Sequence, residues 1–157
     1  MADLYPINAD SESEGISYAI GRYPEDTYDG VGNSKANPWF LCTLAFAETY
    51  YRAIEEWKSA GSIEVTATSA AFFKQFDSNA AEGTTYKADS DEFNAVVKAV
   101  AAEADTYFKR VQKHATNNEM SEQINKETGE ETGANNLTWS YAAFITAAAA
   151  YSGKPAA

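Results

Sequence analysis

One stretch of the chain gathers side chains that suit the binding of a sugar. Arg22 carries a planar fork of hydrogen-bond donors, and Glu25 and Asp26 carry acceptors. Tyr28 and Trp39 add flat apolar faces. A neutral polyhydroxyl ligand needs this mixture, because its hydroxyls take both kinds of hydrogen bond while aromatic rings cover its C–H faces. The same residues would also suit a surface turn that leads into an amphipathic helix, so residue types alone leave both interpretations open.

The single cysteine and the single histidine do not suggest a metal or redox centre. With one cysteine, Cys42, the chain forms neither an internal disulfide nor a cysteine metal cluster. Cys42 lies on the apolar face of an expected helix, where a buried and unreactive thiol is the expected state. His114 lies near the end of another expected helix, where the helix dipole favours a positive charge. We expect no metal and no cofactor.

The composition is that of a globular protein and narrows the class of ligand. The chain has 157 residues, of which 45% are hydrophobic, and this length fits one domain. Its formal net charge is −11, and it has no basic cluster. Nucleic acids and anionic membranes would therefore be repelled, whereas a neutral ligand would not. No apolar run is long enough to cross a membrane, and the first residues lack the features of a signal peptide.

Residues 37 to 61 have the pattern of a long helix that starts beside Trp39. Asn37 suits the N-cap, Pro38 suits the first helical position, and Gly61 suits the stop. Apolar residues repeat at helical spacing between these ends. The polar-aromatic stretch is therefore expected at the N-terminus of a helix.

Two further helices are expected in the middle of the chain. For the β-prone residues that lead into Ser69, a short capped helix over 69–76 is favoured over a sheet, and 83–87 form a connector. A long amphipathic helix then runs from Asp89 to about 115, with Glu92 completing a capping box.

The last part of the chain reads as a long polar loop followed by a helix. Residues 116 to 135 show no periodicity, and a loop of this length inside a compact domain is commonly functional or flexible. Residues 137 to 151 form the final helix, which Gly153 stops. The expected fold class is therefore all-α. Several helix faces are wide enough to need partners that this sequence does not supply, so we expect part of a larger barrel.

Four motifs resemble those of one enzyme family. The chain reads GRYPEDTY at 21–28, NPWFLCTL at 37–44, MSEQ at 120–123 and LTWSYAA at 137–143. In this order and approximate spacing they resemble the fungal glucoamylases of glycoside hydrolase family 15. One such motif could arise by chance, whereas four in register could not. The resemblance places residues 1–157 as the C-terminal portion of the catalytic domain.

The resemblance implies a fold and a reaction. The fold is a six-fold α/α barrel, which would be incomplete in this chain. The reaction is hydrolysis of α-1,4-glucosidic bonds, releasing glucose from the non-reducing ends of starch and maltooligosaccharides with inversion. An inverting glycosidase uses two carboxyl groups about 6.5–9.5 Å apart, one as general acid and one as general base. The family is secreted, so the resemblance implies an extracellular location.

The resemblance assigns Glu122, in the MSEQ motif, as the general base. A carboxylate in a long polar loop can stay ionised and hold a water molecule, which agrees with that role. A solvated loop glutamate without function is the alternative. Glu119 is the nearest competitor, and the resemblance rather than the chemistry separates the two. The family's general acid lies in an upstream segment that this sequence does not contain, so we expect the chain to need the missing N-terminal part of the barrel for activity.

Five other residues match sugar-binding positions of the family. Arg22 matches an arginine that hydrogen-bonds the hydroxyls of the cleaved sugar and its neighbour. Tyr28 and Trp39 match aromatic residues on the leaving-group side, and Trp139 matches one near the cleaved glucose. Core packing is the alternative for these rings. Asp26 is the weakest match, because it could instead orient Arg22.

One departure from the family and two other functions stay open. Residues 29 to 36 are longer than the expected link, which leaves the relative placement of Tyr28 and Trp39 undecided. A non-catalytic α-helical fragment could keep Arg22 and the aromatic rings to bind glucan. An acidic helical scaffold without a ligand is the third interpretation, and it predicts no change of melting temperature with maltooligosaccharides.

Overall fold

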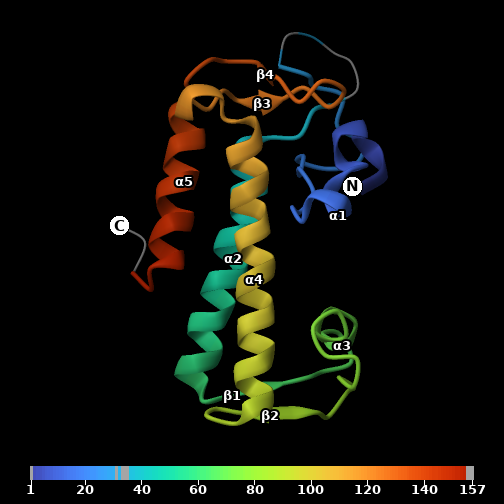
Figure 1. Cartoon of the computed structure of the whole chain (residues 1–157), viewed down its shortest axis with the longest axis vertical. Helices are drawn as coiled ribbons and strands as arrows, with labels where there is room; N and C mark the ends of the chain where they lie inside the picture. The colour runs from blue at the N-terminus through green and yellow to red at the C-terminus, as the bar shows by residue number, and fades with distance from the viewer. Residues whose placement is uncertain (1, 31, 33–35, 155–157) are drawn as a thin grey trace.

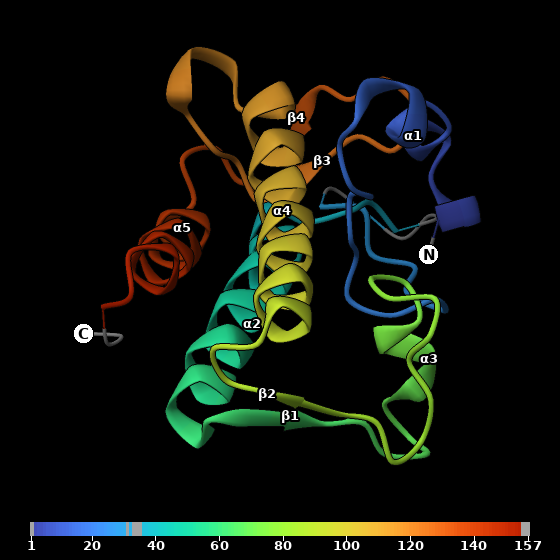
Figure 2. The ribbon, with the colours of Figure 1, turned by 60° about the horizontal axis from the view of Figure 1, so that its bottom comes forward.

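The computed structural model describes residues 2–30, 32 and 36–154. Three long helices form its frame: α2 (Phe40–Ala60), α4 (Asp91–His114) and α5 (Thr138–Tyr151). α2 and α4 run side by side and α5 packs on α2. The short helices α1 (Ser11–Glu14) and α3 (Ala70–Phe73) lie on the side away from α5 (Figures 1 and 2). The all-α prediction is confirmed, and no helix in the described part is long and apolar enough to cross a membrane.

The remaining elements are short. The described residues form three 3₁₀ turns, η1 (Ala2–Leu4), η2 (Pro6–Asn8) and η3 (Thr116–Asn118). Two antiparallel sheets of two strands each pair β1 (Ser62–Glu64) with β2 (Thr85–Lys87) and β3 (Gln123–Ile124) with β4 (Glu131–Thr132). The first sheet lies at the C-terminal end of α2 and the second at its N-terminal end (Figure 1).

α2 begins at Phe40, so the prediction of Asn37 as N-cap and Pro38 as first helical residue is wrong. Asn37 is buried, and its side chain serves two loops instead. Its Nδ2 donates to the carbonyl of Asp29 at 3.1 Å, and its Oδ1 accepts from the backbone N–H of Lys126 at 3.2 Å. These tertiary hydrogen bonds outweigh the local preference for a cap and keep the residues before α2 extended.

The N-cap of α4 lies one residue after the predicted one. Ser90 is the N-cap, and its Oγ accepts from the backbone N–H of Phe93 at 3.1 Å. Asp89 has a φ of 67°, the left-handed conformation of a turn residue, so it does not cap the helix and Glu92 does not complete a capping box with it.

The sheet at the C-terminal end of α2 was not expected. The short helix after Ser69 is present as α3, but it ends at Phe73, and Ser69 makes no side-chain cap hydrogen bond. The segments on either side of it pair as β1 and β2, so the prediction of a connector at 83–87 is wrong. Ile63 lies opposite Tyr86 in register, and both are buried in one cluster with Phe73. Strands of three residues are too short to show a recognisable alternation in the sequence.

The long polar loop is partly a hairpin. Within residues 116 to 135, β3 and β4 pair with Gln123 opposite Thr132 and Ile124 opposite Glu131. Beneath this hairpin an apolar cluster joins all three long helices, and its fully buried members include Phe40, Leu44 and Ile124. Burying each such side chain contributes about 1.5–3 kcal/mol, so the hairpin has a firm apolar base.

The expectation that the helix dipole stabilises a charged His114 is wrong, because burial acts more strongly. Burial lowers the pKa of His114. Its Nδ1 lies 2.8 Å from the carbonyl oxygen of Gly129, so Nδ1 carries the hydrogen, and Nε2 accepts from Nη1 of buried Arg110 at 3.4 Å. Arg110 also donates to the carbonyl of Ser17 at 2.6 Å and to the hydroxyl of Ser11 at 2.6 Å. This network ties the N-terminal segment to α4.

Candidate functional site

The predicted site residues come together at one end of the molecule. The N-terminal ends of α2 and α5 meet the hairpin β3–β4 there (Figure 1). Trp39 forms an antiparallel bridge with Gln123, and the N–H of Ile124 donates to the carbonyl of Pro38 at 2.9 Å. These backbone contacts hold the residue after Glu122 against the start of α2. Glu122 is therefore placed beside the polar-aromatic stretch, although more than eighty residues separate them in sequence.

Arg22 is held by a carboxylate and surrounded by rings. Its Nε and Nη2 donate to the two oxygens of Asp26 at 2.6 and 2.7 Å. The guanidinium carbon lies 5.6 Å from the ring centre of Tyr23, 5.3 Å from that of Tyr28 and 5.0 Å from that of Trp39. Such cation–π contacts and the bidentate pair fix the plane of the guanidinium.

Asp26 acts on Arg22 from a buried position. Its carboxylate also accepts from the backbone N–H of Tyr28 at 3.1 Å. The hydrogen bond from Arg22, followed by that of the backbone, lowers the pKa of Asp26, although burial opposes this shift. The same pair raises the pKa of Arg22. Both Asp26 oxygens are engaged with Arg22, which fits the orienting role left open for this residue.

Three aromatic rings form a row beside Arg22. The ring centres of Tyr28 and Trp39 are 6.2 Å apart, and those of Trp39 and Trp139 are 6.4 Å apart in an edge-on arrangement. Trp39 is 4% exposed and forms the base of the row, whereas Trp139 is 62% exposed. Within this part of the domain the ring of Trp139 is therefore open on most of its surface, while its edge packs against Trp39. The long link does not separate Tyr28 from Trp39, although residues 31 and 33–35 of that link lie outside the described residues.

The Glu122 carboxylate lies between two hydrogen-bond donors. Its Oε2 is 3.1 Å from Nε2 of Gln123 and 3.5 Å from the hydroxyl of Tyr28. Its backbone N–H donates to the carbonyl of Ala134 at 2.9 Å. Gly133 approaches closely, because a Cβ on it would stand 2.7 Å from Oε2, and its φ is +79°. Any side chain at this position would displace the carboxylate.

Glu119 and Cys42 make no hydrogen bond to the described residues of this arrangement, although the Cys42 thiol is close enough to Arg22 and Asp26 to feel their charges. Glu119 is exposed in the turn after α4, whereas Glu122 is half-buried beside the ring of Tyr28. Cys42 is half-buried rather than buried, and burial raises the pKa of its thiol to about 11. The thiol is therefore neutral at pH 7. Among the described residues, no group of three or more His, Cys, Asp or Glu side chains could hold a metal ion.

Two residues at the site were missed by reasoning from the sequence. Gln123 is fully buried, and its Oε1 has no partner among the described residues. Gly133 is required by its contact with Glu122. Gln123 belongs to the MSEQ motif, so the motif contained a signal for it. Nothing in the sequence around Gly133 marks its contact with a carboxylate eleven residues earlier.

Comparison with known proteins gives a consistent result. Residues 1–149 match the model of the glycosyl hydrolases family 15. The chain is 48% identical to glucoamylase 1 of Rhizopus oryzae, over 100% of this chain and 26% of that protein. It is 41% identical to a glucoamylase of Blastobotrys adeninivorans, over 93% of this chain and 24% of that protein.

Solved structures show the same relationship. The glucoamylase of Hormoconis resinae superposes with a TM-score of 0.86 at 40% identity, over 99% of this chain and 26% of that one. The glucoamylase of Saccharomycopsis fibuligera superposes with a TM-score of 0.86 at 33% identity, over 96% of this chain and 32% of that one. This likeness confirms the expected fold class, part of an α/α barrel. The chain spans about a quarter of the length of the curated relatives named above, and it belongs to glycosyl hydrolase family 15.

Proposed function

We propose that this chain forms one wall of the active site of a glucoamylase-type glycoside hydrolase. The enzyme would release glucose from the non-reducing ends of starch and maltooligosaccharides, with inversion, outside the cell. The observation that supports this most is the placement of the Glu122 carboxylate beside the row of Tyr28, Trp39 and Trp139, with Arg22 over the rings of Tyr28 and Trp39. A base, a cationic donor and aromatic faces are what hydrolysis of a glucan requires.

Glu122 is the proposed general base. Both of its side-chain hydrogen bonds fall on Oε2, and Oε1 accepts none from the described residues. Oε1 is therefore available to take a proton from a water molecule that attacks the anomeric carbon. The two donors on Oε2 fix the orientation of the carboxylate. The general acid would come from the remaining part of the catalytic domain, about 6.5–9.5 Å away across the sugar.

Arg22 and the rings would bind the sugar. Asp26 occupies the Nε and Nη2 edge of the guanidinium, which leaves the Nη1 donors to reach sugar hydroxyls. The exposed ring of Trp139 offers a face to the C–H groups of a pyranose. Trp39 lies between Tyr28 and Trp139 and keeps the row in place.

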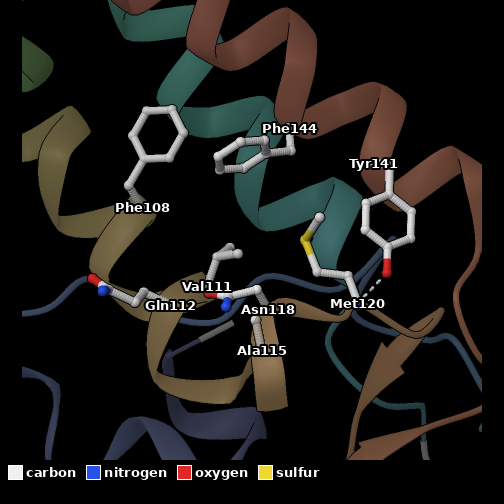
Figure 3. Close-up of a pocket in the computed structure, with 8 residues that line it drawn as sticks. All are labelled: Phe108, Val111, Gln112, Ala115, Asn118, Met120, Tyr141 and Phe144. Carbon is white, nitrogen blue, oxygen red and sulfur yellow. Dashed lines mark hydrogen bonds between the residues drawn. The ribbon is translucent and has the colours of Figure 1, made fainter.

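A groove between α4 and α5 is the proposed contact with the rest of the domain. Its volume is about 460 Å³, and its lining is mostly apolar: Phe108, Val111, Gln112, Ala115, Asn118, Met120, Tyr141 and Phe144 (Figure 3). It contains no carboxyl, imidazole or amino group, so it suits packing rather than catalysis. α5 also exposes Ile145 and Tyr151, at 64% and 63%. A helix that is apolar on most sides is normally covered on most sides.

The test uses this chain mixed with the remaining part of a family 15 catalytic domain, called here the assembled domain. We expect the assembled domain to release glucose from soluble starch, with β-glucose as the first product seen by NMR, and the chain alone to release nearly none. General acid catalysis contributes typically about 10²–10⁴-fold, and the chain alone would lack it. Release of α-glucose, or no release at all, would contradict the proposal.

The non-catalytic interpretation makes a different prediction. The Arg22–Asp26 pair and the aromatic row are complete within this chain, which favours retained sugar binding as the second function. If the chain alone binds maltooligosaccharides as tightly as the assembled domain, and the assembled domain is inactive, the binding function replaces the catalytic one.

A further inference from the structure

The peptide segment just before Glu122 is held on both sides by side chains that do not belong to the sugar-binding row. We propose that Glu131 and Ser140 are positioning residues for the general base, which they hold by fixing the backbone of Ser121. The inference rests on the function proposed for Glu122. Neither residue was among the sequence-based candidates.

Glu131, on β4, bridges two backbone amides with one carboxylate. Its Oε1 accepts from the N–H of Thr116 at 2.9 Å, and its Oε2 accepts from the N–H of Ser121 at 2.6 Å. Its own backbone pairs with Ile124 across the hairpin. One residue thus joins the start of the loop after α4, the residue before Glu122 and the hairpin that follows.

Ser140, on α5, holds the other side of the same residue. It is fully buried, and its Oγ donates to the carbonyl of Ser121 at 2.8 Å. That carbonyl belongs to the peptide group whose N–H is that of Glu122, and this N–H donates to the carbonyl of Ala134 at 2.9 Å. The peptide plane that carries Glu122 is therefore fixed at both its oxygen and its nitrogen.

The segment has little regular secondary structure of its own to hold it. It follows a turn in which Asn117 and Asn118 have φ values of 56° and 62°, the left-handed conformation that asparagine adopts more readily than most residues. The hairpin after Glu122 has only two residues in each of its strands. Displacement of a reacting group by about 1 Å can cost about 100-fold in rate, so loosening this segment should lower turnover.

The first experiment measures amide hydrogen exchange in the chain itself and needs no activity. We expect Glu131→Ala and Ser140→Ala to speed exchange at Ser121 and Glu122 by about tenfold or more. Two matched controls should leave it unchanged. Glu130→Ala removes an exposed carboxylate whose contact is Thr128 Oγ1 at 3.4 Å, and Ser152→Ala removes a hydroxyl bonded to Ala149 at the far end of α5. Unchanged exchange in Glu131→Ala and Ser140→Ala would overturn the inference.

The second experiment measures kinetics in the assembled domain. We expect Glu131→Ala and Ser140→Ala to lower kcat by about 10–100-fold with KM nearly constant, since they displace the base and not the sugar contacts. Glu131→Gln keeps one acceptor oxygen and should fall between wild type and Glu131→Ala. Equal kcat in wild type and both alanine variants would overturn the inference. An inactive wild-type assembled domain would count against the proposed function alone, and amide exchange would still decide whether these residues fix the segment.

Discussion

A two-stranded sheet lies at each end of α2. The two ends differ in whether their buried polar groups have hydrogen-bond partners. At the C-terminal end, Ile63 and Tyr86 are buried, and the Tyr86 hydroxyl donates to Asp77 at 2.8 Å. At the N-terminal end, Trp39 Nε1 and Gln123 Oε1 are buried without a partner among the described residues. An unpaired buried polar group costs about 1–3 kcal/mol. One end is therefore built for stability, and the other carries costs that are typical of a functional site.

The largest loss of stability is expected at the C-terminal end of α2. Phe73→Ala removes a buried ring that packs with Tyr86 and Trp57, and we expect it to lower the free energy of unfolding by about 3–5 kcal/mol. Urea unfolding of the chain measures this. Phe46→Ala, at a 41% exposed ring, should cost clearly less. Sugar affinity of folded Phe73→Ala in the assembled domain should be unchanged, and a specific loss of affinity would show that the two ends are not separate in function.

Arg22→Lys tests the functional end with the next largest effect. Lysine cannot reproduce the planar bidentate contact with Asp26, so the remaining donors lose their orientation. We expect maltooligosaccharide affinity of the assembled domain to fall by about 1.5–3 kcal/mol, measured by calorimetry. Lys58→Arg on α2 is the control, because it also replaces one cationic side chain with the other. Wild-type affinity in Arg22→Lys would refute the proposed role of Arg22 in binding sugar hydroxyls.

Trp139→Ala should have a smaller effect and should separate binding from stability. The ring is 62% exposed, so its loss should leave the urea midpoint of the chain within about 0.5 kcal/mol of wild type. Sugar affinity of the assembled domain should fall by about 0.5–1.5 kcal/mol. A large loss of stability with unchanged affinity would make Trp139 a structural residue.

The smallest effect is expected from His114, through the pH dependence of the free energy of unfolding. The pKa of His114 is lowered by burial from its usual 6.5, so the folded chain disfavours the charged form. Arg110 and Lys113 on α4 add to this effect, while Glu14 on α1 and the Gly129 carbonyl oppose it. The stability due to neutral His114 is complete above pH about 6.5 and is lost as pH falls from there toward the folded pKa.

Urea unfolding at several pH values checks this prediction. His114→Asn keeps a donor for the Gly129 carbonyl and does not titrate, so its stability should fall less between pH 7 and pH 5 than that of wild type. The lowered pKa of Asp26 predicts a separate loss at lower pH, because the folded state then gives up an ionised carboxylate. Equal slopes for wild type and His114→Asn from pH 7 to pH 5 would show that His114 does not contribute.

The three long helices could be predicted from periodicity, but their contacts could not. α4 follows the apolar spacing closely, whereas α5 is apolar on most sides and exposes Ile145 and Tyr151. The start of α2 depends on Asn37 bonding to Asp29 and Lys126, which are distant in sequence. β1 and β2 were missed because three-residue strands carry too little pattern. At the site, residue types left a sugar site and a surface turn both open, and the family motifs selected the sugar and Glu122 over Glu119. The roles of Gln123, Gly133, Glu131 and Ser140 arise from close three-dimensional approach, which spacing does not encode.

The central claim is that the end of α2 near Trp39 holds a general base, and a pair of charge-neutralising variants tests it most directly. Glu122→Gln and Glu119→Gln change the same side chain three residues apart, at a half-buried and an exposed position. In the assembled domain we expect Glu122→Gln to lower the rate of glucose release from soluble starch by about 10²–10⁴-fold, and Glu119→Gln to leave it near that of wild type. A Glu122→Gln rate equal to that of wild type, or a larger loss in Glu119→Gln, would contradict the claim.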